Sequence, residues 1–200
     1  MVLEIIVWVD CCFIIMQLDI KEQSLILEGK KYSRKELMSL SANATGDNTS
    51  SFLLDLYRFL ADWFSDSPFM TVHTSGSTGT PKVLTVRKEQ MMQSARMTCE
   101  FLNLHTGDTA LLCMPLQYIA GKMMVVRALV AGLNLILRTP SGHPLADVTV
   151  PLRFVAMVPL QVFNTLQVLR EKERLCHTDI LIIGGGAIDA ALENEIRLLP

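Results

Sequence analysis

The sequence lacks an excess of basic residues. Its 200 residues include 18 Lys and Arg against 20 Asp and Glu, which gives a formal net charge of -2. A general nucleic-acid binder neutralises phosphates with clustered positive charge, and that electrostatic signature is missing here. We therefore exclude nucleic acid as a partner.

Cysteine is scarce and irregularly spaced. The five cysteines are odd in number and include no C-x-x-C pair, so the usual zinc and dithiol redox motifs are excluded. The four histidines share no spacing typical of metal ligands, and we expect no protein metal site. Reduced thiols are typical of a cytoplasmic protein, which is the location we predict.

No stretch of the chain predicts a membrane span. The most apolar run, residues 1–18, carries Glu4 and Asp10, and a span needs about 20 apolar residues. The run also lacks the basic start and the small-residue cleavage site of a signal peptide. We predict that residues 1–24 form a strand-like or poorly ordered extension. A membrane-associated or signal segment, or a true start at Met16, stays open as an alternative.

Hydrophobic periodicity is the strongest signal that the sequence does contain. Half of the residues are hydrophobic, which is too many for a disordered chain. Apolar runs typical of buried strands alternate with segments that have one apolar face at helical spacing. This order predicts an α/β fold with a mostly parallel sheet flanked by helices. The expected strands are 69–72, 109–115, 133–138, 153–158 and 179–184, and the expected helices are 87–102, 121–131, 159–173 and one that begins at 189.

Smaller elements are expected before residue 69. The alternation around Gly29 predicts a hairpin, and Ser33 followed by Glu36 predicts the capped start of a short helix. The polar residues 42–51 predict a loop, and residues 52–64 predict a helix that faces the core. Its apolar face consists of Phe52, Leu56, Phe59, Leu60, Trp63 and Phe64.

The chain ends inside an apparent helix, directly after a strand that we expect in the interior of the sheet. Natural domains rarely end at such a place. We therefore expect residues 25–200 to be an incomplete domain, seen as a fragment.

One short stretch carries candidate chemistry. The residues "TSGSTGTPK", Thr74 to Lys82, directly follow an apolar strand. Gly76 and Gly79 leave backbone amides open to an anion because no Cβ blocks the approach, and Lys82 adds a countercharge. The hydroxyls that can donate to phosphate oxygens belong to Thr74, Ser75, Ser77, Thr78 and Thr80. Composition alone favours a flexible turn, whereas the position at the end of a strand favours a ligand-binding loop.

The same nine residues resemble the phosphate-binding loop of the adenylate-forming superfamily of acyl-CoA synthetases, luciferases and peptide adenylation domains. Three more segments resemble superfamily motifs in the expected order: "MPLQYIAG" (114–121), "MVPLQV" (157–162) and "ILIIGGGAI" (180–188). The resemblance implies part of a large N-terminal AMP-binding domain, with the C-terminal lid domain absent. By that resemblance the loop would hold the ATP phosphates, with Lys82 as the catalytic cation. The residues that would lie against adenine and the acyl group are Gly184, Gly185, Gly186 and Ala187.

Within the superfamily, the chain is most similar to the o-succinylbenzoate-CoA ligases of menaquinone biosynthesis. The similarity rests on the short segment before the loop, on the "VPLQ" turn, and on Arg127 six residues after Gly121. It implies a substrate pocket at Tyr118, Gly121 and Arg127, with Arg127 facing the second carboxylate or the ketone of the acid. A solvated or ion-paired arginine is the alternative. Tyr118 stands where many relatives carry histidine.

The activity that the resemblance implies has two steps. A small carboxylic acid and ATP would give an acyl-adenylate and pyrophosphate, with Mg²⁺ assisting, and CoA would then displace AMP to form a thioester. Several parts of this machinery lie beyond the glycine turn in the superfamily: a Thr-Glu pair, a ribose-binding aspartate and the lysine of the lid domain. We therefore expect the 200-residue chain alone to be inactive, and we leave a homo-oligomer open.

Two other classes of function are compatible with parts of this pattern. A non-catalytic nucleotide-binding or interaction module could keep the phosphate loop and lack the chemistry. A P-loop NTPase is disfavoured, because Pro81 precedes Lys82 and no Ser or Thr follows it.

Overall fold

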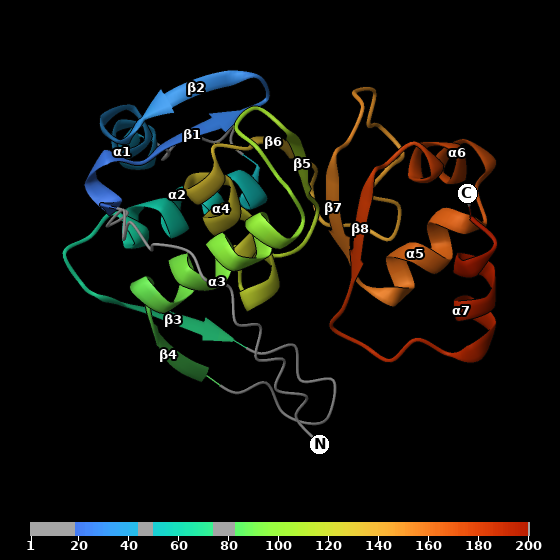
Figure 1. The fold of residues 1–200 in the computed structure, drawn as a ribbon. Coiled ribbons are helices and arrows are strands. Elements are labelled where there is room, and N and C mark those ends of the chain that lie inside the picture. The colour runs from blue at the N-terminus through green and yellow to red at the C-terminus, as the bar shows by residue number, and fades with distance from the viewer. Residues whose placement is uncertain (1–18, 44–49, 74–82, 200) are drawn as a thin grey trace, which may run out of the picture.

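The computed structural model describes residues 19–43, 50–73 and 83–199. A six-stranded sheet forms its middle layer, in the order β2-β1-β6-β5-β7-β8 (Figure 1). β2 pairs antiparallel with β1, and every other neighbouring pair is parallel, so the predicted α/β class is confirmed. The strands are β1 (Ser24–Leu27), β2 (Lys30–Ser33), β5 (Thr109–Leu112), β6 (Asn134–Leu137), β7 (Phe154–Met157) and β8 (Ile180–Ile183).

Helices cover both faces of the sheet (Figure 1). One face carries α2 (Ser51–Trp63), α3 (Lys88–Phe101) and α4 (Ile119–Ala131), with α1 (Arg34–Asn43) packed on α2. The other face carries α5 (Pro159–Leu166), α6 (Leu169–Cys176) and α7 (Ala190–Arg197). A short 3-10 turn, Ile20–Glu22, precedes β1.

The continuous apolar runs are explained by two hydrophobic cores, one on each side of the sheet. Successive side chains of a strand point to opposite faces. Ala110 and Leu112 of β5 accordingly join the core under α2, α3 and α4, whereas Leu111 and Cys113 join the core under α5, α6 and α7. A strand that is buried on both faces has no polar alternation, which is what the sequence shows.

Several local predictions are confirmed. Glu36 accepts from the backbone N–H of Ser33 at 2.8 Å, and the backbone N–H of Glu36 donates to the Ser33 hydroxyl at 3.4 Å. Gly132 ends α4 with φ of 69°, a left-handed conformation that favours glycine. All six residues of the expected apolar face of α2 are buried.

The segment before the phosphate loop differs from its prediction as a buried strand. β3 (Phe69–His73) alternates exposed and buried residues and lies outside the main sheet. It pairs antiparallel with β4 (Val83–Arg87), a strand that the sequence analysis missed. β4 is exposed along most of its length, so it has no continuous apolar run to reveal it.

Two further boundaries are corrected. The single helix expected over 159–173 is two helices, because Val168 is extended (φ -114°, ψ 110°) and its carbonyl starts α6 by accepting from the backbone N–H groups of Glu171 and Lys172. The loop expected over 42–51 is shorter, since α1 continues through Asn43 and α2 begins at Ser51. In the described part of the chain, no helix has the length and apolar character to cross a membrane.

Candidate functional site

The carboxyl ends of three parallel strands gather the sequence motifs at one edge of the sheet. Segment 113–118 follows β5, Val158 and Pro159 follow β7, and segment 184–187 follows β8. The backbone N–H of Gly184 donates to the carbonyl of Met157 at 3.1 Å, which ties the last two segments together. We call this edge, formed by the carboxyl ends of β5, β7 and β8, the carboxyl edge. Such an edge is where α/β proteins bind ligands.

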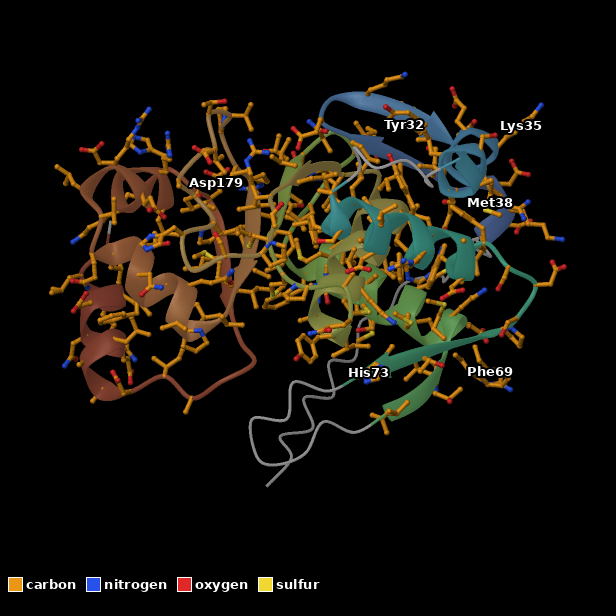
Figure 2. The ribbon with its side chains drawn as sticks, turned by 180° about the vertical axis from the view of Figure 1, so that it is seen from behind. Tyr32, Lys35, Met38, Phe69, His73 and Asp179 are labelled. Atoms are coloured by element: carbon orange, nitrogen blue, oxygen red, sulfur yellow. The ribbon has the colours of Figure 1, made fainter. Side chains whose placement is uncertain are left out.

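The candidate phosphate loop, 74–82, lies outside the described residues, but its two flanks are described. His73 and Val83, which flank the loop, are paired across the β3–β4 ribbon, so the two flanks lie side by side. His73 also forms a parallel bridge with Tyr118. Figure 2 shows His73 at the end of β3 that borders the loop, and Phe69 at the far end. The described flank of the loop at His73 therefore lies beside the carboxyl edge.

Tyr118 and Gly121 form the start of α4. Tyr118 is half-buried and immediately precedes the helix. Gly121 is buried, and a Cβ at this position would lie 2.5 Å from the carbonyl oxygen of Pro115. Glycine is required here because the helix packs directly on the backbone of segment 113–118. Gly121 therefore lets the start of α4 lie directly against segment 113–118, which belongs to the predicted pocket.

Arg127 lies farther along α4, near the start of β7. Nine residues separate it from Tyr118, a distance of about 13.5 Å along the helix axis. Its guanidinium lies 6.0 Å from the ring centre of Phe154, and burial lowers its pKa. Nε has no hydrogen-bond partner, and no carboxylate lies within ion-pair distance, among the residues that the structure describes. The Arg127 Nη1 donates to the Met124 sulfur at 3.6 Å.

The glycine turn after β8 lines a hollow of about 600 Å³. Gly185 has φ of 80°, and no atom lies within 4 Å of a Cβ built on Gly184. Bare backbone therefore faces open space here. The other walls are Val158, apolar side chains of α5 and α7 that include the half-exposed Phe163, and the acidic residue Asp189 at the start of α7. A flat aromatic or acyl group fits such a surface.

Gln161 connects these segments, a role that the sequence analysis did not assign. Its buried side-chain amide donates to the carbonyls of Cys113 and Ser141 at 3.1 and 2.9 Å, and accepts from the backbone N–H of Val158 at 3.1 Å. Burial raises the pKa of the neighbouring Cys113 thiol to about 12, so this cysteine is no nucleophile. The signal for Gln161 was a polar residue in the otherwise apolar start of a helix.

A larger hollow, of about 890 Å³, lies at the other end of the β3–β4 ribbon and holds none of the predicted site residues. Its walls include Pro68 and the buried Lys88, whose ammonium donates to the Ser65 carbonyl at 2.9 Å. Within the described ranges, no group of three or more His, Cys, Asp or Glu side chains could hold a metal ion. We take the smaller hollow as the candidate site because the motif segments converge beside it.

Comparison with known proteins gives one matching family. Residues 9–199 match the family model of AMP-binding enzymes. A curated relative, the 2-succinylbenzoate–CoA ligase of Haemophilus influenzae, is 28% identical over 144 residues, which are 72% of this chain and 31% of that enzyme.

Two solved structures are similar in fold. The acyl-CoA synthetase (AMP-forming)/AMP-acid ligase II-like protein from Dyadobacter fermentans has a TM-score of 0.70 and 33% identity, over 81% of this chain and 46% of that protein. The O-succinylbenzoate coenzyme A synthetase of Bacillus subtilis, in complex with AMP, has a TM-score of 0.52 and 21% identity, over 64% of this chain and 27% of that enzyme. The chain spans less than half the length of these relatives.

Proposed function

Because the chain belongs to the AMP-binding enzyme family, we propose that it supplies the ATP- and acid-binding part of an acid-CoA ligase. We further propose o-succinylbenzoate as the acid. The similarity to a 2-succinylbenzoate–CoA ligase supports that choice.

One observation carries the proposal: three of the motif segments meet at the carboxyl edge. The phosphate loop leaves from His73, which is bridged to Tyr118, while Gln161 joins the end of β5 to the start of α5. The glycine turn hydrogen-bonds to the end of β7. A triphosphate at the loop, an acid at segment 114–121 and an adenine at 184–187 would therefore occupy neighbouring places.

In the proposed reaction, a carboxylate oxygen of the acid attacks the α-phosphorus of ATP. The new P–O bond forms as the bond to the β-phosphate oxygen breaks, and pyrophosphate leaves with that electron pair. The amides, hydroxyls and Lys82 of the loop would stabilise the charge that accumulates on pyrophosphate. Mg²⁺, when bound, would offset part of the same charge, but the described residues offer no cluster of ligands for it. The thiolate of CoA would then attack the acyl carbonyl and release AMP.

Arg127 is the proposed ligand of the second carboxylate. A half-buried guanidinium without a carboxylate partner among the described residues is a costly arrangement that a dicarboxylic acid would relieve. Arg127 lies near the start of β7, about 13.5 Å along α4 from Tyr118, so the acid would have to reach well away from the carboxyl edge to meet it.

The test is ATP–pyrophosphate exchange by the complete polypeptide with o-succinylbenzoate and with a panel of aromatic and fatty acids. We expect exchange with o-succinylbenzoate, and a loss of roughly 100- to 1,000-fold in the Lys82→Ala variant. Lys172→Ala, which removes an exposed lysine on α6, is the matched control. Exchange that is unchanged in Lys82→Ala would contradict the proposed loop.

The acid specificity is tested separately with Arg127→Leu. We expect the KM for o-succinylbenzoate to rise on the order of tenfold or more, because a charge-assisted pair is worth about 1.5 to 3 kcal/mol. The KM for an aromatic monocarboxylate should not change. ATP binding without exchange, for any acid, would support the non-catalytic module instead.

A further inference from the structure

Lys122 connects the two binding segments of the candidate site. It lies in the second turn of α4, and its ammonium donates to the backbone carbonyl of Thr71 at 2.5 Å. The side chain is half-buried, and burial lowers its pKa. No carboxylate lies within ion-pair distance of it in the described ranges. Partial burial of a charged ammonium costs free energy, so we expect this lysine to have a role other than contact with solvent.

The Lys122 hydrogen bond and the Tyr118 bridge are spaced almost equally along α4 and along β3. Tyr118 and Lys122 are four residues apart on α4, a rise of about 6 Å. Their partners, His73 and Thr71, are two residues apart on β3, about 6.6 Å. The bridge from Tyr118 to His73 and the hydrogen bond from Lys122 to Thr71 therefore join the helix to the strand at two matched points.

Among the described residues, the edge of β3 that faces α4 pairs with no strand. β3 pairs with β4 on its opposite edge. In this part of the chain, the carbonyl of Thr71 is held by Lys122 and not by a neighbouring strand. Thr71 lies three residues before Thr74, about 10 Å along an extended chain, so Lys122 acts on the strand and not on a phosphate held by the loop.

We propose that Lys122 is a positioning residue for acid activation. It fixes the strand from which the phosphate loop leaves against the segment that binds the acid. The role rests on the proposed function, in which the α-phosphorus and the attacking carboxylate must meet within about 3 to 3.5 Å, where a displacement of 1 Å can lower the rate about 100-fold. A residue that sets this alignment changes the rate more than it changes binding.

The test is the kinetics of ATP–pyrophosphate exchange in the complete polypeptide with Lys122→Met and Lys122→Arg. We expect Lys122→Met to lower kcat on the order of 10- to 100-fold, with the KM values for ATP and for the acid within about threefold of the parent. Lys122→Arg, which can still donate to the Thr71 carbonyl, should recover most of the rate. Lys172→Met controls for the lost charge, and thermal unfolding shows whether each variant is folded.

The outcomes separate this role from the proposed function. A parent that forms no adenylate with any acid overturns the function and, with it, the role of Lys122. An active parent with an equally active Lys122→Met overturns the role alone, and so does a defect confined to KM. If Lys122→Met fails to fold, Lys122→Arg and Lys122→Gln decide: a kcat in the Gln variant equal to that of the Arg variant contradicts the need for a cationic donor.

Discussion

Polar groups are arranged differently at the amino ends and at the carboxyl ends of the same parallel strands. At the amino ends of β5, β7 and β8, Arg153 lies 3.1 Å from the carboxylate of Asp179 and 3.9 Å from that of Asp108. At the carboxyl edge, no ion pair involves segments 113–118, 158–159 or 184–187, and the pair of Arg138 with Glu28, at 3.2 Å, follows the neighbouring β6. The contacts at this edge are the close packing of Gly121 on Pro115, the hydrogen bonds of the buried Gln161 amide, and the hydrogen bond from Lys122 to the Thr71 carbonyl. Figure 2 labels Asp179, which immediately precedes β8, and His73, the last residue of β3, which is bridged to Tyr118.

This difference indicates separate roles for the two ends of the strands. Charges that neutralise one another hold strands together and leave nothing for a ligand. Cations and backbone groups without acidic partners attract an anion, and glycine lets it approach. We infer that the Arg153 network at the amino ends stabilises the sheet, whereas the segments of the carboxyl edge are free to bind a ligand.

The largest effect is expected from Gly121→Ala. The new Cβ would meet the backbone oxygen of Pro115 at 2.5 Å, so the helix must move, at a cost of about 3 kcal/mol in the free energy of unfolding. Gly184→Ala is the matched change at the same edge, where a Cβ meets nothing within 4 Å. We expect it to keep full stability but to weaken ATP binding. Chemical denaturation and calorimetry measure the two effects, and equal destabilisation by both variants would contradict the packing role of Gly121.

A smaller effect is expected from Gln161→Leu, which removes the link between the end of β5 and the start of α5. The variant leaves a backbone group of the buried Cys113, and those of Val158 and the exposed Ser141, without this partner, and we expect a loss of about 2 kcal/mol of stability. Gln167→Leu, at an exposed position after α5, should cost almost nothing. Equal unfolding midpoints for the two variants would show that the link carries no stability.

The smallest effect is expected at the amino ends. Arg153→Met removes a partly exposed ion-pair network, which is worth about 1 kcal/mol. ATP affinity should stay at the parent value. Arg58→Met, which removes the exposed pair with Asp55, should change stability still less. A loss of ATP affinity in Arg153→Met would erase the distinction between the two ends.

The sequence predicted the middle of the main sheet well because strands such as β5 and β7 are buried on both faces. Runs such as 109–115 and 153–158 have no polar alternation, and α4, between them, is apolar on most sides. β4 was missed for the opposite reason: it is exposed and depends on pairing with β3. The break at Val168 was missed because neither glycine nor proline marks it.

The candidate site was predicted only in part. Motif resemblance named the segments, and the order of strands placed three of them at one edge. The long-range contacts could not be predicted, because Gln161 and Lys122 act on backbone carbonyls 48 and 51 residues away in the sequence. No local pattern encodes such a contact. The roles of residues 74–82 stay a prediction, since they lie outside the described residues.

The most direct test of the account is hydrogen–deuterium exchange of the complete polypeptide with and without ATP. We predict that ATP slows exchange in segments 74–82 and 184–187 and leaves the amino ends of β5, β7 and β8 unchanged. Protection at the hollow beside Lys88, or at the amino ends, with none in segment 74–82, would contradict the assignment of ATP binding to the carboxyl edge.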